Sequence, residues 1–260
     1  MKLPDNNNSV LHPPHSVFEE LYARYNHREF VHPDPLEFLY AYDDLRDREI
    51  VALIASSLAY GRVQQILKSV SIVLETIGPP LRYVQTTSRS KMKRHFRDFK
   101  HRFTTGDEVA DLLWGIESVL EKHGSLGVCF ARGIDGKDEN VKNALGHFAC
   151  ELTAPVGNKK TSLIPDPQKG SACKRLNLML RWMVRKDEVD PGGWDQIDTS
   201  MLIVPLDVHM HRIAIEHGLT RRKNADMRTA LEITDAFAGY SPEDPVRYDF
   251  ALTRPPIGGH

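Results

Sequence analysis

The sequence predicts an all-α protein, on three observations. Apolar residues recur at three- and four-residue spacing in one segment after another along the 260-residue chain. Ser, Asp, Pro and Gly stand where helices begin and end. The only strand-like piece, "MLIVPL" at 201–206, is too short to build a sheet, and there is no convincing hairpin or βαβ unit.

The expected helices follow from apolar periodicity and from the residues that flank it. They cover 16–26, 34–42, 47–60, 63–78, 106–124, 138–153, 171–185, 208–217, 224–239 and the short segment 241–253. The expected N-caps are Ser16, Asp34, Asp107, Ser171, Asp207 and Ser241, and the expected closing glycines are Gly78, Gly124 and Gly218. A Pro-, Gly- and Lys-rich break at 154–170 separates the helices before it from those after it.

Composition sets the broad class of protein. Hydrophobic residues make up 41% and charged residues 27%, which is an ordinary globular balance. No apolar run approaches the roughly 20 residues that cross a bilayer, and residues 1–16 are polar and Pro-rich, unlike a signal peptide. Three cysteines, Cys129, Cys150 and Cys173, fit reduced thiols better than a disulfide framework or a four-ligand iron–sulfur cluster. We expect a cytoplasmic protein without a membrane partner.

A formal net charge of −1 hides a segregation of charge along the chain. Residues 1–60 hold five Lys/Arg against ten Asp/Glu, whereas 82–102 and 158–186 each hold eight Lys/Arg against one acid. Residues 209–223 add four more basic residues against Glu216. These stretches either form one positive face for a polyanion or are three separate solvated surfaces.

Asp207 is the first candidate site residue. Pro205 disfavours helical backbone at Val204, so the apolar run arrives extended and Asp207 takes the N-cap position of the helix that follows. The helix dipole and the first-turn amides favour its ionised form. Asp207 is therefore either a simple cap or a carboxylate held for chemistry, as a general base or to stabilise a developing cation.

Lys174 is the second candidate. With Ser171 as N-cap, Lys174 occupies position N3, where the helix dipole and the neighbouring Arg175 disfavour an ammonium group. A lysine in such a place can act as a nucleophile. The alternative is a surface lysine that faces phosphate.

A metal site at Asp207, His209 and His211 is a weaker interpretation. Only some of these side chains share a helix face, and the chain has no "HExxH" or similar paired-ligand motif. We expect no metal and no cofactor.

Together these residues resemble a known superfamily. "VPLDVHMHRIAIEHGLT" is similar to the segment around the catalytic aspartate of helix-hairpin-helix DNA glycosylases, the endonuclease III superfamily, with Val208 replacing the usual Thr or Ser. "DPQKGSACKRLNLML" occupies the place of the hairpin and the helix that carries the lysine in the bifunctional members, so that Lys174 matches this lysine. The usual Leu-Pro-Gly-x-Gly hairpin is absent, and only Gly170 remains. The spacing of 33 positions from Lys174 to Asp207 is closer to archaeal 8-oxoguanine glycosylases.

The resemblance implies a function and a set of site residues. Asp207 would stabilise the positive charge on the sugar as a damaged base leaves, and Lys174 would attack the anomeric carbon and form a Schiff base. "LIASSLAYGRVQQI" resembles the superfamily's early helix and loop that reach into DNA. The implied DNA-binding residues are Arg62, Gln64, Gln65, Lys169, Gly170, Ser171, Arg175, His209 and Arg212. The partner would be duplex DNA with a damaged base, and the protein a monomer. Trp182 and Trp194 could stack on an extruded base, although we expect Trp182 to be packed inside the protein.

The resemblance also implies two helical lobes, with the active site in the cleft between them and a divergent helix-hairpin-helix. Residues 47–167 would form the central lobe, while 1–46 and 168–260 would pack together as the other. From about residue 15 onward, the chain also resembles an uncharacterised bacterial family whose members share "RWMVR", "PLDVH" and "YDFAL".

Three functions remain open at this point. The first is a base-excision glycosylase, with or without AP-lyase activity, acting on a damaged base such as an oxidised purine. The second is a protein on the same scaffold that binds damaged or distorted DNA without chemistry. The third is a metal-dependent hydrolase that uses Asp207, His209 and His211.

Overall fold

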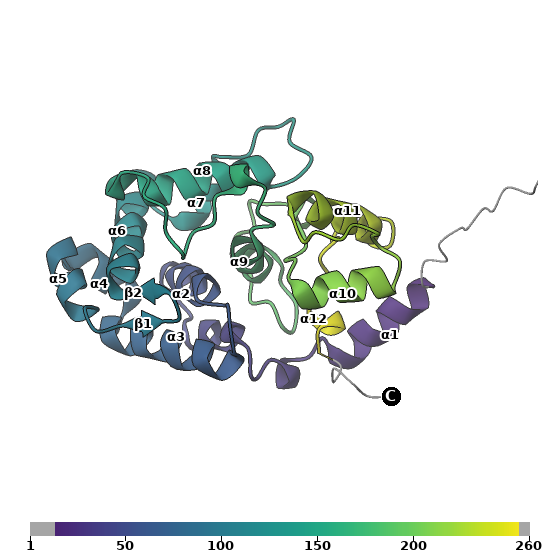
Figure 1. Ribbon diagram of the computed structural model, residues 1–260, viewed down its shortest axis with the longest axis horizontal. Helices are drawn as coiled ribbons and strands as arrows, with labels where there is room; N and C mark the ends of the chain where they lie inside the picture. The colour runs from purple at the N-terminus through teal and green to yellow at the C-terminus, as the bar shows by residue number, and fades with distance from the viewer. Residues whose placement is uncertain (1–13, 255–260) are drawn as a thin grey trace, which may run out of the picture.

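Two helices, α2 (Leu45–Ser57) and α9 (Lys174–Val184), form the centre of the fold and pack against each other. The computed structural model describes residues 14–254 (Figure 1). Each of the two helices contains nine consecutive buried residues, because its sequence is apolar on nearly every side. Such helices need neighbours all round, and two groups of helices provide them.

The first group surrounds α2 and fills one half of Figure 1. It consists of η2 (Pro35–Ala41), α3 (Val63–Ile77), α4 (Pro80–Thr86), α5 (Arg89–His95), α6 (Gly106–His123), α7 (Leu126–Ala131) and α8 (Lys142–Thr153), where η denotes a 3-10 helix. A two-stranded antiparallel hairpin, β1 (Lys100–His101) and β2 (Thr104–Thr105), lies beside α3.

The second group fills the other half of Figure 1, with α9 between the two groups. It consists of α1 (His15–Tyr25), α10 (Val208–Glu216), α11 (Met227–Ala238) and α12 (Asp249–Leu252). Short 3-10 turns complete the described chain: η1 (Arg28–Phe30), η3 (Ala154–Val156), η4 (Pro167–Lys169) and η5 (Thr199–Met201). Helix α1 packs on α12, whereas η2 packs on α2 and α3, so the N-terminal segment touches both groups.

The all-α prediction is confirmed, and most expected helices occur within a few residues of their expected bounds. The segment 34–42 is a 3-10 helix, and 241–253 contains only the four-residue helix α12. Helices α4, α5 and α7 and the hairpin were not predicted. All four are short, and a two-residue strand gives no periodic signal in a sequence.

The expected helix ends are partly right. Asp34 and Asp207 are N-caps, and Gly78 and Gly124 close their helices with positive φ. Gly218, with φ 71°, follows the end of α10. The predictions of Ser16, Asp107, Ser171 and Ser241 as N-caps were wrong; the caps are Pro14, Thr105, Cys173 and Tyr248.

The error at Asp107 has a clear physical reason. Thr105 accepts a hydrogen bond from the Glu108 amide, and the Glu108 carboxylate accepts one from the Thr105 amide. This reciprocal capping box satisfies two otherwise free donors, so the helix begins ahead of Asp107.

Buried aromatic residues join the segment after α9 to the first group of helices. Trp194 is 1% exposed and lies against Phe130 and Phe148. Its indole donates a hydrogen bond to Glu49, which also accepts from the backbone amides of Leu126 and Gly127. Burial raises the pKa of Glu49 despite these three donors. Trp194 is therefore not available to stack on a base, and Trp182 is packed inside the protein as expected.

Three further expectations concern composition. Cys129, Cys150 and Cys173 are all free thiols. Within residues 14–254, every helix is too short or too polar to cross a bilayer. The expectation that residues 1–16 are no signal peptide lies almost wholly outside the described residues.

Candidate active site

Lys174 and Asp207 form an ion pair between the first turns of two helices. Lys174 is the first residue of α9, and Asp207 is the N-cap of α10. The Lys174 Nζ lies 3.3 Å from Asp207 Oδ2, and each side chain is about one-third exposed, at 31% and 30%. The two candidates, 33 positions apart in sequence, are therefore adjacent in space and still accessible to solvent.

The sequence around Asp207 fixes its carboxylate. Residues 202–206 are all buried and lie outside any helix or strand, and α10 starts immediately after Asp207. Asp207 Oδ1 accepts hydrogen bonds of 2.9 Å from the amides of His209 and Met210. Burial pushes the pKa of Asp207 upward, but the Lys174 charge and these amides outweigh it and hold the pKa below its ordinary value. The carboxylate is thus ionised, and its second oxygen faces Lys174.

The start of α9 differs from the prediction. Lys174 is at N1 and not N3, because Ser171 does not begin the helix. The Ser171 hydroxyl accepts a hydrogen bond from the Cys173 amide, and Cys173 adopts a left-handed conformation with φ 49° before the helix starts. Arg175 turns away from Lys174: it donates to the Ser57 carbonyl at 2.8 Å, and its guanidinium lies over the Tyr60 ring.

The pair lies on the wall of a cavity of about 990 Å³. Lys174, Leu178 and Arg181 all line it, since residues four and seven positions apart share one face of α9. The opposite sides come from the end of α2, from α3, α10 and α12, and from the chain before η2. The remaining lining residues are Pro33, Asp34, Pro35, Ala59, Val63, Ile66, Pro205, His209, Met210, Arg212, Ile213, Glu216, Asp249, Leu252, Thr253 and Arg254.

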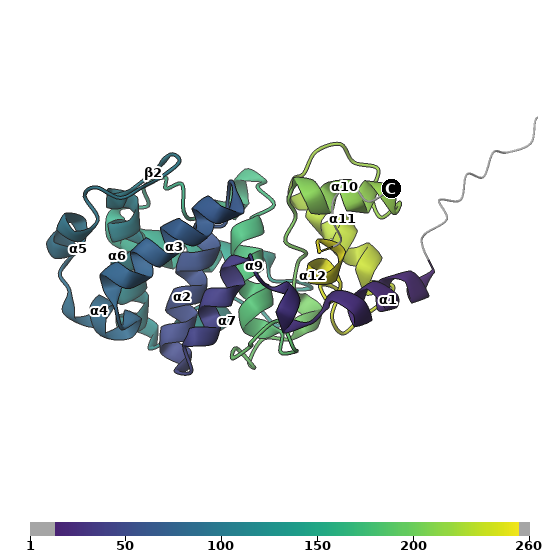
Figure 2. The same cartoon turned by 90° about the horizontal axis from the view of Figure 1, so that it is seen from below.

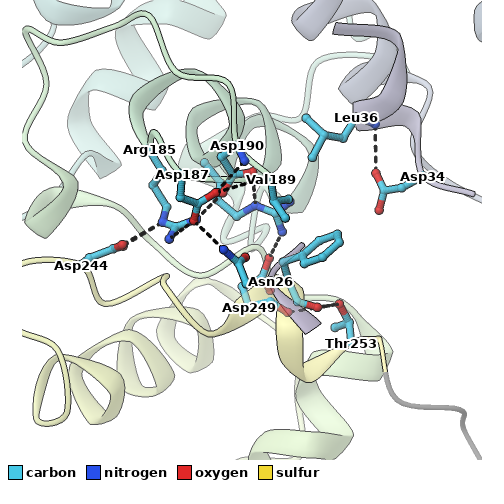
Figure 3. Close-up of polar contacts among 12 residues, drawn as sticks. Asn26, Asp34, Leu36, Arg185, Asp187, Val189, Asp190, Asp244, Asp249 and Thr253 are labelled. Atoms are coloured by element: carbon cyan, nitrogen blue, oxygen red, sulfur yellow. Dashed lines mark hydrogen bonds and ion pairs between the residues drawn. The ribbon is translucent and has the colours of Figure 1, made fainter. Parts of the chain in front are cut away.

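A buried charge network supports this cavity from below. Arg181 donates to Asp190 and to Asp249, and Asp249 also lines the cavity. Arg254 and Asp34, which both line the cavity, form an ion pair at 3.0 Å. One helical turn further along, Arg185 pairs with three acidic residues from two places in the chain: Asp187 and Asp190 in the loop that follows it, and Asp244 (Figure 3).

The network is almost fully removed from solvent. Arg181 and Arg185 are each 3% exposed, and Asp190 is 0% exposed. Burial would lower the pKa of both guanidinium groups, but the surrounding carboxylates outweigh it and raise the pKa. Both arginines are therefore charged and paired with carboxylates, although the buried Arg181 Nη2 has no hydrogen-bond partner among the described residues.

The other predicted DNA-binding residues fall into three places. His209 and Arg212 line the cavity with Lys174 and Asp207. Arg62, Gln64 and Gln65 are exposed at the start of α3, where their neighbours Val63 and Ile66 line the cavity. Lys169, Gly170 and Ser171 are exposed but lie beside other hollows, away from the pair.

The predicted hairpin before α9 has little regular structure. A single 3-10 turn, η4, leads to Gly170 in the left-handed conformation with φ 78°. Ser171 then pairs with Asp226 in an isolated bridge, and the Met227 amide donates to the Gly170 carbonyl. The segment is held by α11, and in the described residues no α-helix directly precedes this turn.

The interpretation of 158–186 as one basic surface stretch was wrong in part. Arg181 and Arg185 belong to the buried network, and Arg175 is half-buried on Tyr60. Lys159, Lys160, Lys169 and Lys186 are exposed. Sequence charge overestimated the positive surface here, because partners far along the chain neutralise the two arginines.

The residues proposed for a metal do not converge. The His211 Nε2 lies 2.8 Å from the Arg222 carbonyl, and His211 does not line the cavity, whereas His209 does. Within residues 14–254 no three His, Cys, Asp or Glu side chains are grouped so that they could hold a metal ion.

Five charged lining residues escaped the sequence reasoning: Asp34, Arg181, Glu216, Asp249 and Arg254. For Arg181 a signal existed. An arginine seven positions after Lys174 in an apolar helix shares the Lys174 face, which should have placed it in the same site. Asp34, Asp249 and Arg254 come from distant segments, and no local pattern marks them.

Comparison with known proteins gives a family. Residues 34–257 match the family described as a protein of unknown function (DUF2400). The chain belongs to this family, which the resemblance in "RWMVR", "PLDVH" and "YDFAL" anticipated in general terms. Searches of curated proteins and of solved structures returned no match.

Proposed function

We propose that this protein is a DNA glycosylase with AP-lyase activity that removes a damaged base, with an oxidised purine as the first substrate to test. The observation that carries the proposal is the 3.3 Å pairing of Lys174 and Asp207 on the wall of a large cavity. A nucleophile and an ionised carboxylate at this separation can act on one sugar.

Each residue has a role in the proposed reaction. The C1′–N bond breaks and the base leaves with the bonding electrons, while Asp207 stabilises the positive charge on the sugar. Lys174 gives up a proton, which neutralises the departing base, and its nitrogen bonds to C1′. Opening of the sugar ring then yields a Schiff base, from which the 3′ phosphate is eliminated with a proton from C2′.

The cavity supports the proposal in two further ways. A volume of about 990 Å³ is at the upper end of ordinary ligand sites and leaves room for a nucleotide turned out of a duplex. Exposed Arg62, next to the lining residue Val63, and exposed Arg212, which lines the cavity, are the residues we propose for binding phosphates.

The test is borohydride trapping. Labelled duplexes with 8-oxoguanine, uracil, thymine glycol or an abasic site are incubated with the protein and reduced, and the expected result is a covalent adduct. Lys174→Ala should abolish the adduct. Lys122→Ala, which changes an exposed lysine of α6 that pairs with Glu151 and does not line the cavity, is the matched control and should retain it.

Other outcomes assign the function differently. Base release without an adduct, lost in Asp207→Asn, would indicate a monofunctional glycosylase. Binding of damaged duplex without release or adduct would contradict the enzymatic proposal and favour the non-catalytic binder on the same scaffold.

A further inference from the structure

The hairpin β1–β2 presents an aromatic side chain at its tip. Phe103 is 63% exposed, the highest exposure among the large hydrophobic residues of the described chain after Val208. Its ring stacks on Tyr60 with centroids 4.9 Å apart and an interplanar angle of 21°. The two rings form a flat apolar surface that is outside the hydrophobic core.

The hairpin is anchored so that this surface has a fixed position. The Tyr60 hydroxyl donates to the His101 carbonyl at 3.0 Å and shares a hydrogen bond with Thr104. The His101 ring is buried between Ser69 and the Tyr60 carbonyl, and this burial lowers its pKa, so the ring is neutral. His101 and Thr104, which make these contacts, are buried, whereas Arg102 and Phe103 at the tip are exposed, as are Lys100 and Thr105.

The surroundings of the two rings are positive. Residues 58–74 and 99–106 contain no Asp or Glu but contribute Arg62, Lys68, Lys100 and Arg102. The Arg175 guanidinium lies 5.1 Å from the Tyr60 ring centroid. Flat aromatic faces among arginines are what nucleic-acid proteins use to stack bases and to hold phosphates.

A close approach at Gly61 keeps Arg102 against this surface. Gly61 has φ +100°, and a Cβ there would lie 2.9 Å from the Arg102 Cδ. Arg102 itself is in the left-handed region, with φ 53°. Glycine is therefore needed both for the backbone and for the passage of the arginine side chain.

The surface adjoins the cavity and shares its side of the molecule. Ala59 and Val63, on either side of Tyr60 and Gly61, line the cavity. Figure 2 shows the hairpin and α10, which carries Asp207 at its start, along the same edge of the molecule. A strand that enters the cavity can therefore continue past the hairpin.

We propose that Phe103 and Tyr60 form a stacking platform for an unstacked DNA base next to the nucleotide in the cavity, with Arg62 and Arg102 on the flanking phosphates. This inference rests on the proposed function for its ligand, DNA, but not on any chemistry at Lys174. Phe103 fills the space that the displaced nucleotide leaves, or holds the base that has lost its neighbour.

The test compares three labelled oligonucleotides: a single strand, a paired duplex, and the same duplex with a tetrahydrofuran abasic site. Fluorescence anisotropy gives the Kd of each. Phe103→Ala should weaken binding to the single strand and the abasic duplex about ten-fold and leave the paired duplex nearly unchanged. Phe103→Trp should retain wild-type binding, and Phe103→Leu, which keeps apolar bulk without an aromatic face, should resemble alanine. Ile72→Ala, which shortens an exposed apolar side chain on α3, is the control for general surface effects.

A second readout is 2-aminopurine placed beside the abasic site. Stacking on Phe103 should quench its fluorescence in the wild type but not in Phe103→Ala. Equal Kd values for wild type and Phe103→Ala, or the same loss on all three oligonucleotides, would overturn the platform.

The platform and the proposed function fail separately. Aromatic-dependent binding without a borohydride adduct would keep the platform and contradict the lyase. An adduct together with DNA binding that does not depend on Phe103 would support the lyase and contradict the platform. Absence of DNA binding by the wild type would contradict both proposals.

Discussion

Helix α9 carries two charged systems that differ in burial and in the number of partners. At its first turn, Lys174 has one carboxylate partner, Asp207, and both side chains are about one-third exposed. Two to three turns later, Arg181 and Arg185 share four buried or half-buried acids and are almost inaccessible. The same helix thus holds a pair that is partly exposed and a network that is buried, of which Arg181 and Asp249 also border the cavity.

The comparison teaches how to separate structural charge from functional charge. Arg185, whose guanidinium is paired with three carboxylates, has no capacity for a substrate, and removing it leaves uncompensated charge. An ion pair that is one-third exposed contributes little to the free energy of unfolding, so a stabilising role does not explain the pair of Lys174 and Asp207. Four predictions test this contrast, in order of expected effect.

Arg185→Met should have the largest effect on stability. It leaves Asp187, Asp190 and Asp244 without their shared partner, at a cost of about 3–5 kcal/mol in the free energy of unfolding. Urea unfolding followed by circular dichroism measures it. Arg212→Met, which breaks an exposed pair with Glu216, is the control and should change stability by less than about 0.5 kcal/mol. A loss under about 1 kcal/mol for Arg185→Met would show that the network is not needed for the fold.

Asp207→Ala should have an intermediate effect, because it removes the N-cap of α10 as well as the charge. The expected loss is about 1 kcal/mol in the free energy of unfolding. Asp207→Asn is the matched variant, since asparagine caps a helix nearly as well and carries no charge. Equal stability losses in the two variants, measured by urea unfolding, would mean that the cap is not what Asp207 contributes.

Lys174→Met should have a small effect on stability, under about 1 kcal/mol, because the pair with Asp207 is partly solvated. In the trapping experiment this variant should form no covalent adduct. Thermal unfolding alongside trapping separates these two results. A melting temperature that falls as far as in Arg185→Met would place Lys174 with the structural charges.

The smallest expected effect is on the titration of Asp207. Its folded pKa lies below the ordinary 3.8, so its contribution to stability is present above that pH and is lost as pH falls through the folded pKa. Lys174→Met removes a positive charge and should raise the pKa of Asp207 towards 3.8. Carbon-13 NMR of the carboxyl carbon measures this shift, and an unchanged pKa would contradict the ion pair.

Much of the helix content could be predicted from the sequence. The segments 63–78 and 106–124 carry an apolar stripe with the right period, and their ends at Gly78 and Gly124 are determined by residues within a turn. Asp207 as N-cap belongs here too, because Pro205 and the apolar run before it are local features. The predicted N-cap positions were wrong where two capping candidates lay within one turn of each other, as with Thr105 and Asp107.

The sequence by itself determined the all-α fold, the capping of α10 by Asp207 and the presence of Lys174 at the start of another helix. Only the tertiary structure brought Lys174 to 3.3 Å from Asp207, enclosed them with Asp249 and Arg254, and buried Arg181 and Arg185 among acids. The reason is physical: helix periods and caps depend on neighbours within about four residues. Ion pairs, cavities and the exposure of Phe103 depend instead on segments that meet only when the chain is folded.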